Sequence, residues 1–446
     1  MTRSEWLIGL AVVMCLATFF RTYQLTRTPP GLFFDEAANG TDALEAIRSG
    51  HWSVFYPQNG GREGLFINLQ SLMLRATGVR EPWVLRSVSA IFGILTVLGV
   101  AFLGSQVGGR EVGFVAAFLM AAGFWHVNFS RIGLRAISAP FFLTWAIVIL
   151  RAAQKNRRLS LYFAAGIVYG LGFHTYIAYR VTPLIFGFAV ISVLRSVRAA
   201  VAVMIGAVLA AFPLILYFQA HPADFLGRVS AVAPTSAMQI ARNALLTFTM
   251  LIAHGDENWR HNVSGSPQFW LPVGLLFLAG LGWCLTGRAR SSGLLLIWLV
   301  AGALPAALSG EAVPHALRSI LMIPAVCLIA AIGFVQLYRL RPNKALAAIV
   351  LGAIAIQGYM QYFVVWSKDA RVAEAFGAKY LNQAYAIREA SRNGSGIYVV
   401  VHDLGVSDPL YLAQPVMFLT ERNVHYLAEG NESQIPPGSR VFRISP

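Results

Sequence analysis

Charged residues are scarce in this chain of 446 residues. They make up 12% of the sequence, about half the share of an average soluble protein, whereas 57% of the residues are hydrophobic. This balance excludes a soluble globular enzyme and a disordered chain. Cysteine is scarce as well: Cys15, Cys284 and Cys327 all lie in apolar runs, so a disulfide-stapled secreted domain is excluded and nothing follows about the redox compartment.

The few charges that are present are mostly positive, with a formal net charge of +15. A nucleic-acid-binding protein gathers such charge on one soluble face. Here the basic residues are scattered between apolar runs. We therefore attribute them to membrane topology and to attraction of anionic membrane lipids, and we expect no nucleic-acid partner.

Long apolar runs predict an α-helical polytopic membrane protein with about eleven transmembrane helices. A bilayer core needs about 20 mostly apolar residues per helix. The first run, Trp6 to Phe20, lacks a small-residue cleavage site, so we interpret it as a membrane anchor and not as a signal peptide. The other expected spans are residues 83–104, 112–128, 137–152, 161–179, 181–195, 199–219, 269–286, 293–308, 317–338 and 345–365.

The positive-inside rule predicts the orientation of these spans. With the N-terminus in the cytoplasm, the inside segments hold thirteen basic residues and only two acidic ones, Glu5 and Glu111. The basic residues are Arg3, Arg110, Arg151, Lys155, Arg157, Arg158, Arg195, Arg198, Arg288, Arg290, Arg339, Arg341 and Lys344. An odd number of spans then puts the C-terminus outside. We expect a bacterial inner membrane protein with an external or periplasmic C-terminus.

The predicted external segments are very unequal in length. Residues 21–82 form a long first loop, and residues 220–268 form a second. We expect residues 1–365 to form a transmembrane domain that includes both loops, and residues 366–446 to form a small external α/β domain.

The pattern of the tail supports that α/β assignment. Val372, Phe376 and Tyr380 recur at a spacing of four, which predicts a helix. The runs Ile397–Val401 and Val416–Leu419 are apolar and short, which is typical of strands.

The first loop begins with Pro30-Gly31-Leu32-Phe33-Phe34-Asp35-Glu36-Ala37. The stretch from Asp35 to Arg48 predicts a helix with Gly50 as its C-cap. Adjacent helical residues point about 100° apart, so one acid can face inward while the other braces the loop. Acids at a helix N-terminus also complement the helix dipole without any function. Their position next to lipid favours a functional acid that faces a cavity.

A second motif in this loop is Asn59-Gly60-Gly61-Arg62-Glu63-Gly64-Leu65-Phe66. The glycines permit a tight turn, and the apolar run from Leu65 to Leu74 predicts an amphipathic helix at the membrane interface. Arg62 and Glu63 mark the start of that helix, and the ordinary alternative for them is a solvated ion pair.

Two further motifs complete a resemblance: Phe129-Ser130-Arg131-Ile132-Gly133-Leu134-Arg135 and Pro314-His315-Ala316-Leu317-Arg318. A short first span, an Asp-Glu pair, a long loop with interfacial helices and many further spans resemble the GT-C membrane glycosyltransferases. Within them the chain is most similar to the group of protein O-mannosyltransferases and lipid A aminoarabinose transferases, in particular the bacterial members of glycosyltransferase family 39. The likeness covers about the first 340 residues.

The resemblance implies a reaction. A polyprenyl-phosphate sugar would donate its sugar to a hydroxyl of a protein, lipid or glycan acceptor at the external face, with inversion at the sugar carbon. Asp35 would be the general base, and Glu36 and Glu63 are further candidates for the catalytic site. Many relatives carry a second carboxylate in the loop before the fourth span, but residues 124–138 contain no acid, so this role falls to Glu63 or is absent. Gly64 stands where relatives often have proline.

A leaving phosphate needs cations near the external face. Arg131 and Arg135 are four residues apart, so on a helix they would share a side and clamp one phosphate. The other candidate donor-phosphate ligands are Arg180, His315 and Arg318. The ordinary alternative for each arginine is snorkelling to lipid headgroups.

The second long loop carries a run of histidines and acids from His254 to Asn262. It fits no standard zinc spacing, and the resemblance favours acceptor contacts. The candidate acceptor-side residues are Arg62, His254, Asp256 and Arg260. No metal ligands are assigned. A divalent metal held by Asp35 with Glu63 is left open, because some relatives use one.

Two other functions compete with the transferase. A transporter or lipid flippase often shows internal repeats and acids at the membrane midplane, and this chain shows neither. A non-enzymatic assembly subunit for surface polymers would not need the carboxylate of Asp35.

The predicted orientation is directly testable. We expect a reporter enzyme that is active only outside the cytoplasm to be active when fused after Pro446. The same reporter fused in the predicted inside loop at Arg157 is the control and is expected to be inactive. Activity at Arg157 together with silence at Pro446 would reverse the topology.

Overall fold

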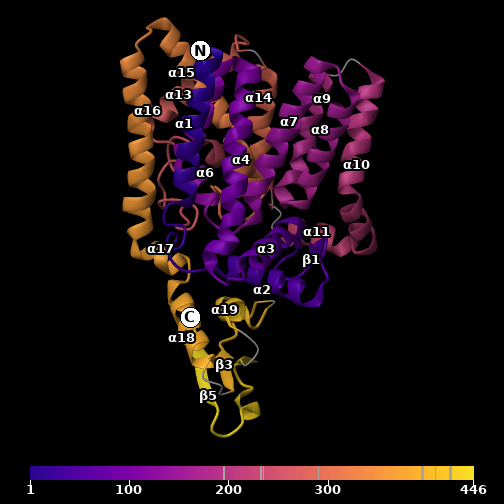
Figure 1. Cartoon of the computed structure of the whole chain (residues 1–446), viewed down its shortest axis with the longest axis vertical. Helices are drawn as coiled ribbons and strands as arrows, with labels where there is room; N and C mark the ends of the chain where they lie inside the picture. The colour runs from indigo at the N-terminus through magenta and orange to yellow at the C-terminus, as the bar shows by residue number, and fades with distance from the viewer. Residues whose placement is uncertain are drawn as a thin grey trace. The chain divides into compact units, whose positions relative to one another are not determined.

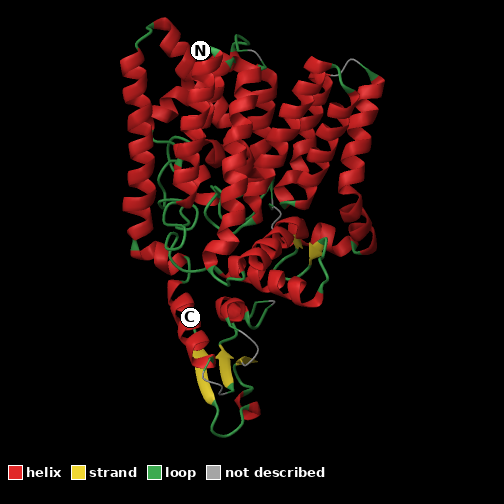
Figure 2. Cartoon of the chain, in the orientation of Figure 1, coloured by secondary structure: helices red, strands yellow, loops and turns green. Residues whose placement is uncertain are grey.

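The computed structural model describes the whole chain except residues 194–195, 232–233, 235, 290, 393–395, 407 and 421–423. Figure 2 shows that helices dominate the described part of the chain. Arg195 and Arg290, two of the basic residues used to predict the topology, lie outside the described residues.

The chain divides into two compact units. One comprises Met1–Tyr23, Ser89–Arg131 and Arg135–Trp366, and the other comprises Gln24–Val88, Ile132–Leu134 and Ser367–Pro446. The first loop thus shares a compact unit with the tail. The division into a transmembrane domain of residues 1–365 and an external domain of residues 366–446 stays a prediction.

The first unit is a bundle of helices, drawn from indigo to orange in Figure 1. Its main helices are α1 (Arg3–Thr22), most of α4 (Pro82–Gly108), α5 (Arg110–Ala122), α6 (Phe124–Phe129), α7 (Ser138–Asn156), α8 (Leu159–Leu171), α9 (Thr182–Val193), α10 (Val197–Ala220), α11 (Pro222–Ala231), α12 (Ala237–Thr249), α13 (Leu271–Leu285), α14 (Ser292–Ala307), α15 (Ile323–Leu340) and α16 (Lys344–Tyr359). Short 3-10 turns lie at Arg135–Ile137, Gly172–His174, Ile177–Val181, Ile320–Met322 and Trp366–Lys368, and α16 continues as a π-helix at Met360–Val365.

Within the described residues, six helical segments are long and apolar enough to cross a membrane. They are Arg3–Thr22, Pro82–Gly108, Arg135–Asn156, Val197–Ala220, Ile320–Leu340 and Lys344–Lys368, and four shorter apolar segments accompany them. The polytopic helical fold is therefore confirmed. The count of about eleven crossings stays a prediction.

Small residues let these helices approach closely. The helix α8 packs against α7 and α10, and α15 packs against α5 and α13. A Cβ atom at Gly280 of α13 would lie 1.8 Å from the carbonyl oxygen of Ile329 in α15, and one at Gly333 of α15 would lie 2.0 Å from the carbonyl oxygen of Leu276. Only glycine fits at either position, as is common between helices in membranes.

The second unit combines short helices with a small sheet. Its elements are α2 (Phe34–Ser49), β1 (Phe55–Tyr56), β2 (Arg62–Glu63), α3 (Gly64–Thr77), the start of α4, α17 (Ala370–Ala375), α18 (Ala378–Ser391), β3 (Ile397–Val401), α19 (Gln414–Leu419), β4 (Val424–Ala428) and β5 (Arg440–Ile444). Strands β3, β4 and β5 form a parallel sheet in the order β4-β3-β5, and β1 pairs antiparallel with β2. The helices predicted at Asp35–Arg48 and Leu65–Leu74 are confirmed as α2 and α3, and Gly50 caps α2 in the left-handed conformation.

One hydrophobic core explains why the first loop joins the tail. It contains Ala37 and Ala43 of α2, Ile67 of α3, and Val416 and Phe418 of α19. A Cβ atom at Gly40 would lie 2.5 Å from the ring of Phe418, so α2 and α19 touch where glycine leaves room. The α/β tail is confirmed, with one error: residues 416–419 are helical and not a strand. Pro415 lies in the first turn of α19, where proline favours a helix.

Candidate functional site

The predicted acid pair Asp35 and Glu36 begins α2, and the structure separates the two roles. Glu36 is fully buried in the second unit. Its Oε1 accepts hydrogen bonds from Arg86 Nε at 2.9 Å and from the main-chain N–H of Gly133 at 2.7 Å. Its Oε2 accepts from Arg86 Nη2 at 3.1 Å and from the N–H of Phe33 at 3.3 Å.

These contacts make Glu36 a bracing residue. Arg86 also donates to the carbonyl oxygens of Pro29, at 2.7 Å, and Gly31, at 2.8 Å. A buried carboxylate with four donors favours a structural role, and the catalytic assignment of Glu36 stays a prediction. Arg86 was missed from the sequence, although an arginine near the start of an apolar span is itself a signal.

Asp35 lies half-buried one residue earlier. Among the described residues, the recorded hydrogen bond to its carboxylate comes from Asn59 Nδ2 at 2.9 Å. Asn59 has a left-handed backbone with φ of 52°, which asparagine tolerates better than most residues. The turn before β2 therefore orients the carboxylate of Asp35 without burying it.

The next predicted pair, Arg62 and Glu63, forms β2 and is buried. Arg62 donates to Asn39 Oδ1 at 2.8 Å and forms an ion pair with Asp42. Burial raises the pKa of Asp42, and the charge of Arg62 opposes that shift. Arg62 thus ties β2 to α2, which favours a structural role, and its assignment to the acceptor side stays a prediction. Glu63 stays a candidate.

The predicted clamp of Arg131 and Arg135 does not form. The first residue lies in a turn after α6 and the second begins a 3-10 helix, so they share no helical face. Arg131 is fully buried, and its Nη1 and Nη2 donate to the carbonyl oxygens of Phe20 and Tyr23 at 2.9 and 2.7 Å. Its guanidinium also lies over the ring of Phe363, 5.0 Å from the centroid. Arg131 therefore anchors the end of α1, and its assignment to the donor phosphate stays a prediction.

The remaining arginines occupy three different segments of the first unit. Arg135 is 8% exposed and lies over the ring of Tyr176, 5.7 Å from its centroid. Arg180 donates to the carbonyl oxygen of Phe225 at 2.6 Å. Arg318 pairs with Glu311, an exposed acid, at 3.1 Å. Arg135 and Arg318 come shortly before α7 and α15, and Arg180 comes shortly before α9.

Side chains of α6 hold two loops, one after α12 and one after α14. Trp125 donates through Nε1 to the carbonyl oxygen of Ala316 at 3.0 Å, and Asn128 donates to the carbonyl oxygen of Arg260 at 2.7 Å. Asp256 Oδ1 accepts the N–H of Asn258 at 2.8 Å, which makes a local Asx turn. These bonds fix the positions of Asp256 and of the loop that carries His315.

Three side chains meet there: Asp256, His261 and His315. Asp256 Oδ2 accepts from His261 Nδ1 at 2.8 Å and from the N–H of Ala316 at 2.7 Å, and it lies 4.0 Å from His315 Nδ1. One ligand atom from each of the three lies within 4.8 Å of the others. His261 was not assigned to the site from the sequence, because only the fold brings His315 next to it.

The surroundings shift the pKa values of Asp256 and His315. Burial raises the pKa of Asp256, but the hydrogen bond and charge of His261 outweigh burial and leave the pKa lowered. Burial, reinforced by the charge of His261, holds the pKa of His315 well below its usual value. An ionised carboxylate beside a neutral imidazole suits a transition metal such as zinc. By contrast, His254 of the same loop is exposed and pairs with Glu257 at 3.2 Å.

Comparison with known protein families gives one match. Residues 65–218, about a third of the chain, match the family described as dolichyl-phosphate-mannose-protein mannosyltransferase. No curated protein matches the chain by sequence.

Solved structures match most of the chain. The chain is similar to ArnT from Cupriavidus metallidurans bound to undecaprenyl phosphate, with a TM-score of 0.66, 12% identity, and coverage of 99% of this chain and 90% of that one. It is also similar to the archaeal oligosaccharyltransferase AglB from Archaeoglobus fulgidus in complex with an inhibitory peptide and dolichol-phosphate, with a TM-score of 0.56, 14% identity and coverage of 94% and 64%. The resemblance to the GT-C glycosyltransferases is confirmed as a shared fold.

The bracing role of Glu36 predicts a loss of stability. Glu36→Ala leaves Arg86 buried without its carboxylate, which costs about 3–5 kcal/mol, so we expect a clearly lower thermal unfolding midpoint in detergent. Glu45→Ala is the matched control, because Glu45 lies on the same helix but is exposed and pairs only with exposed Arg48. Equal midpoints for the two variants would contradict the bracing role.

Proposed function

We propose that this chain, with the fold of the GT-C membrane glycosyltransferases, transfers a sugar from a polyprenyl-phosphate donor to a hydroxyl acceptor. The family match to mannosyltransferases and the lipid phosphates bound to the structural relatives support the donor class. The reaction would take place at the external face of a bacterial inner membrane, with the N-terminus in the cytoplasm. The sugar is hexosyl or pentosyl, and the acceptor is a protein, lipid or glycan.

The placement of Asp35 carries this proposal. Displacement at an anomeric carbon needs a base that removes the proton of the acceptor hydroxyl. Asp35 is a half-buried carboxylate oriented by Asn59, next to a residue that is locked in an ion pair. Such a carboxylate can take up a proton while its main chain stays fixed. Attack from the side opposite the leaving phosphate inverts the configuration at the sugar carbon.

A leaving phosphate needs positive charge that stabilises it. Arg135, Arg180 and Arg318 are the arginines that we propose for it, and His315, the fourth candidate from the sequence, is proposed below as a metal ligand instead. All four lie in segments that the predicted topology puts outside, each before a helix that returns toward the cytoplasm. Arg260 and the exposed His254 are proposed for the acceptor side.

We also propose that Asp256, His261 and His315 hold a divalent metal. Two imidazoles and one carboxylate leave a fourth position open in a tetrahedral zinc site. These three side chains offer three ligand atoms within 4.8 Å of one another. The alternative pair, Asp35 with Glu63, would offer only two carboxylates. A bound ion would add positive charge near His315 and fix the loop that carries Arg318.

The role of Asp35 is tested by Asp35→Asn, which keeps the size of the side chain and an acceptor for Asn59. We expect sugar transfer from polyprenyl-phosphate sugar to fall at least about a hundredfold, because the variant cannot take the acceptor proton. Binding of polyprenyl phosphate and the thermal unfolding midpoint should stay unchanged. Full activity of Asp35→Asn in reconstituted vesicles would exclude Asp35 as the base.

A second variant separates donor binding from proton transfer. Arg318→Gln is expected to weaken binding of polyprenyl phosphate, whereas Arg48→Gln, which removes an exposed arginine of α2, should leave it unchanged.

The metal proposal is tested by the metal content of the purified protein. We expect wild type loaded with Zn²⁺ and then freed of excess ion to retain about one equivalent. The substitutions His261→Ala and His315→Ala should each lower the affinity of the protein for Zn²⁺ at least about tenfold, since each removes one of three ligands. The control is His254→Ala, which removes an exposed histidine of the same loop. Equal retention in all four proteins would leave the three residues as a hydrogen-bonded cluster.

A further inference from the structure

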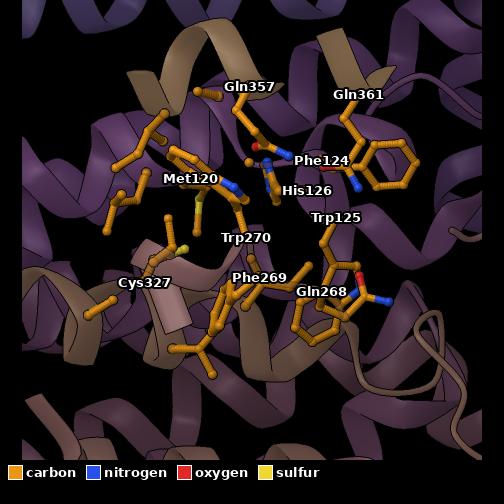
Figure 3. Close-up of a pocket in the computed structure, with 18 residues that line it drawn as sticks. Met120, Phe124, Trp125, His126, Gln268, Phe269, Trp270, Cys327, Gln357 and Gln361 are labelled. Carbon is orange, nitrogen blue, oxygen red and sulfur yellow. Dashed lines mark hydrogen bonds between the residues drawn. The ribbon is translucent and has the colours of Figure 1, made fainter. Parts of the chain in front are cut away.

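The first unit contains a pocket that the proposed reaction does not use. It encloses about 570 Å³ of space not filled by protein atoms, part of it open to the surroundings. Its walls are apolar, with Val273 of α13, Val326, Cys327 and Ala330 of α15, and Ile354 of α16. Figure 3 shows these walls together with the polar side chains His126, Gln268, Gln357 and Gln361.

The imidazole of His126 offers a hydrogen-bond donor to this pocket. Arg21 Nη2 lies 2.6 Å from His126 Nδ1, and an arginine can only donate, so Nδ1 is the acceptor. The hydrogen of the neutral ring is then on Nε2. That atom is buried and has no partner among the residues that the structure describes. A buried N–H group without a partner is unfavourable, so a ligand that accepts from it would be stabilised.

Amide side chains complete the polar end of the pocket. Gln268 is 6% exposed, and neither its Nε2 nor its Oε1 has a partner in the described part of the chain. Gln357 donates to Gln361 at 2.6 Å. Gln361 lies in the π-helical segment after α16, and such segments often occur at functional sites.

The charge near this polar end is positive. Arg21 is fully buried, and its recorded partners are neutral: His126 and the carbonyl oxygens of Ala17, Met120 and Ala121. Arg131 adds a second buried guanidinium, bound to carbonyl oxygens on either side of Arg21. A bundle interior that holds these charges favours an anionic occupant.

The position of Arg21 along α1 indicates which kind of anion would bind. It comes 18 residues after the start of α1 at Arg3, which is roughly 27 Å along a helix. This nearly equals the hydrocarbon thickness of a bilayer, about 30 Å. The helix therefore brings Arg21 and His126 to the level at which lipid phosphates and esters lie.

We propose that this pocket binds a membrane lipid through its phosphate. The phosphate oxygens accept from His126 Nε2–H and from the amide of Gln268, and the apolar chain lies along α13, α15 and α16. The apolar walls suit the chain of a lipid better than a free sugar, and glutamines are poor ligands for a metal ion. The occupant that we propose is a bilayer glycerophospholipid, because polyprenyl phosphate is already assigned to the proposed reaction with Arg135, Arg180 and Arg318.

The proposal is tested by native mass spectrometry of the purified full chain, titrated separately with phosphatidylglycerol, undecaprenyl phosphate and inorganic phosphate. We expect Gln268→Leu and His126→Phe to weaken binding of phosphatidylglycerol about tenfold or more, the value of one lost charge-assisted hydrogen bond. Weaker binding of undecaprenyl phosphate alone would assign the pocket to the carrier lipid of the proposed reaction and would overturn this proposal. Inorganic phosphate is expected to bind weakly to every variant.

Two controls keep the test specific. His174→Phe removes another buried histidine of the first unit, whose Nε2 bonds to the carbonyl oxygen of Ala210, and should leave lipid binding unchanged. Asp35→Asn should also leave it unchanged, so failure of the proposed transferase and failure of this site are distinguishable. If His126→Phe does not fold, Gln268→Leu decides, because that side chain loses no recorded partner. Lipid binding equal to wild type in Gln268→Leu would overturn the proposal.

Discussion

The buried ion pair between Glu36 and Arg86 is the constraint on which the candidate site depends. It joins the start of α2 to the start of α4, and the N–H of Gly133 adds a third segment. Because both charges are fully buried, breaking the pair is costly, and the segment from Pro29 to Glu36 has one favourable position. Asp35 belongs to this segment, so its main chain is held in the same position. The acid that we propose as the base is thus positioned by a neighbour in a buried ion pair.

Buried polar side chains also fix the positions of loops in the helical bundle of the first unit. Trp125 and Asn128 bind carbonyl oxygens of two distant loops, and Trp366 binds the carbonyl oxygen of Trp259 at 2.8 Å. An indole or amide buried in such a bundle needs a partner, so each bond fixes one loop in one place. The cluster of Asp256, His261 and His315 follows from these bonds. The atoms His126 Nε2, Gln268 Nε2 and Gln268 Oε1 are among the buried side-chain atoms without a partner in the described part of the chain, and they carry the lipid proposal.

Much of the architecture was predictable from local patterns. Apolar length predicted the spans, and Asp35–Arg48 followed by Gly50 predicted α2, because helix caps depend on near neighbours. The strand expected at residues 416–419 was wrong, since a short apolar run fits a strand or a buried helix equally well. From the sequence, Arg62 was assigned to the acceptor side and Arg131 to the donor phosphate, because a sequence shows charge but not burial. In the structure their guanidiniums are consumed by Asp42 and by the end of α1.

The sequence by itself determined that this protein lies in a lipid membrane, that it is helical, and that an acid motif stands at Asp35. These features could be predicted because hydropathy, charge bias and helix capping act over a few residues. Only the tertiary structure decided which acid is buried, which arginines are consumed and which histidines meet. Glu36 finds Arg86 fifty residues away, and Asp256 finds His315 across 59 residues. Such pairings depend on how helices pack, and packing is a property of the whole chain that no local window contains.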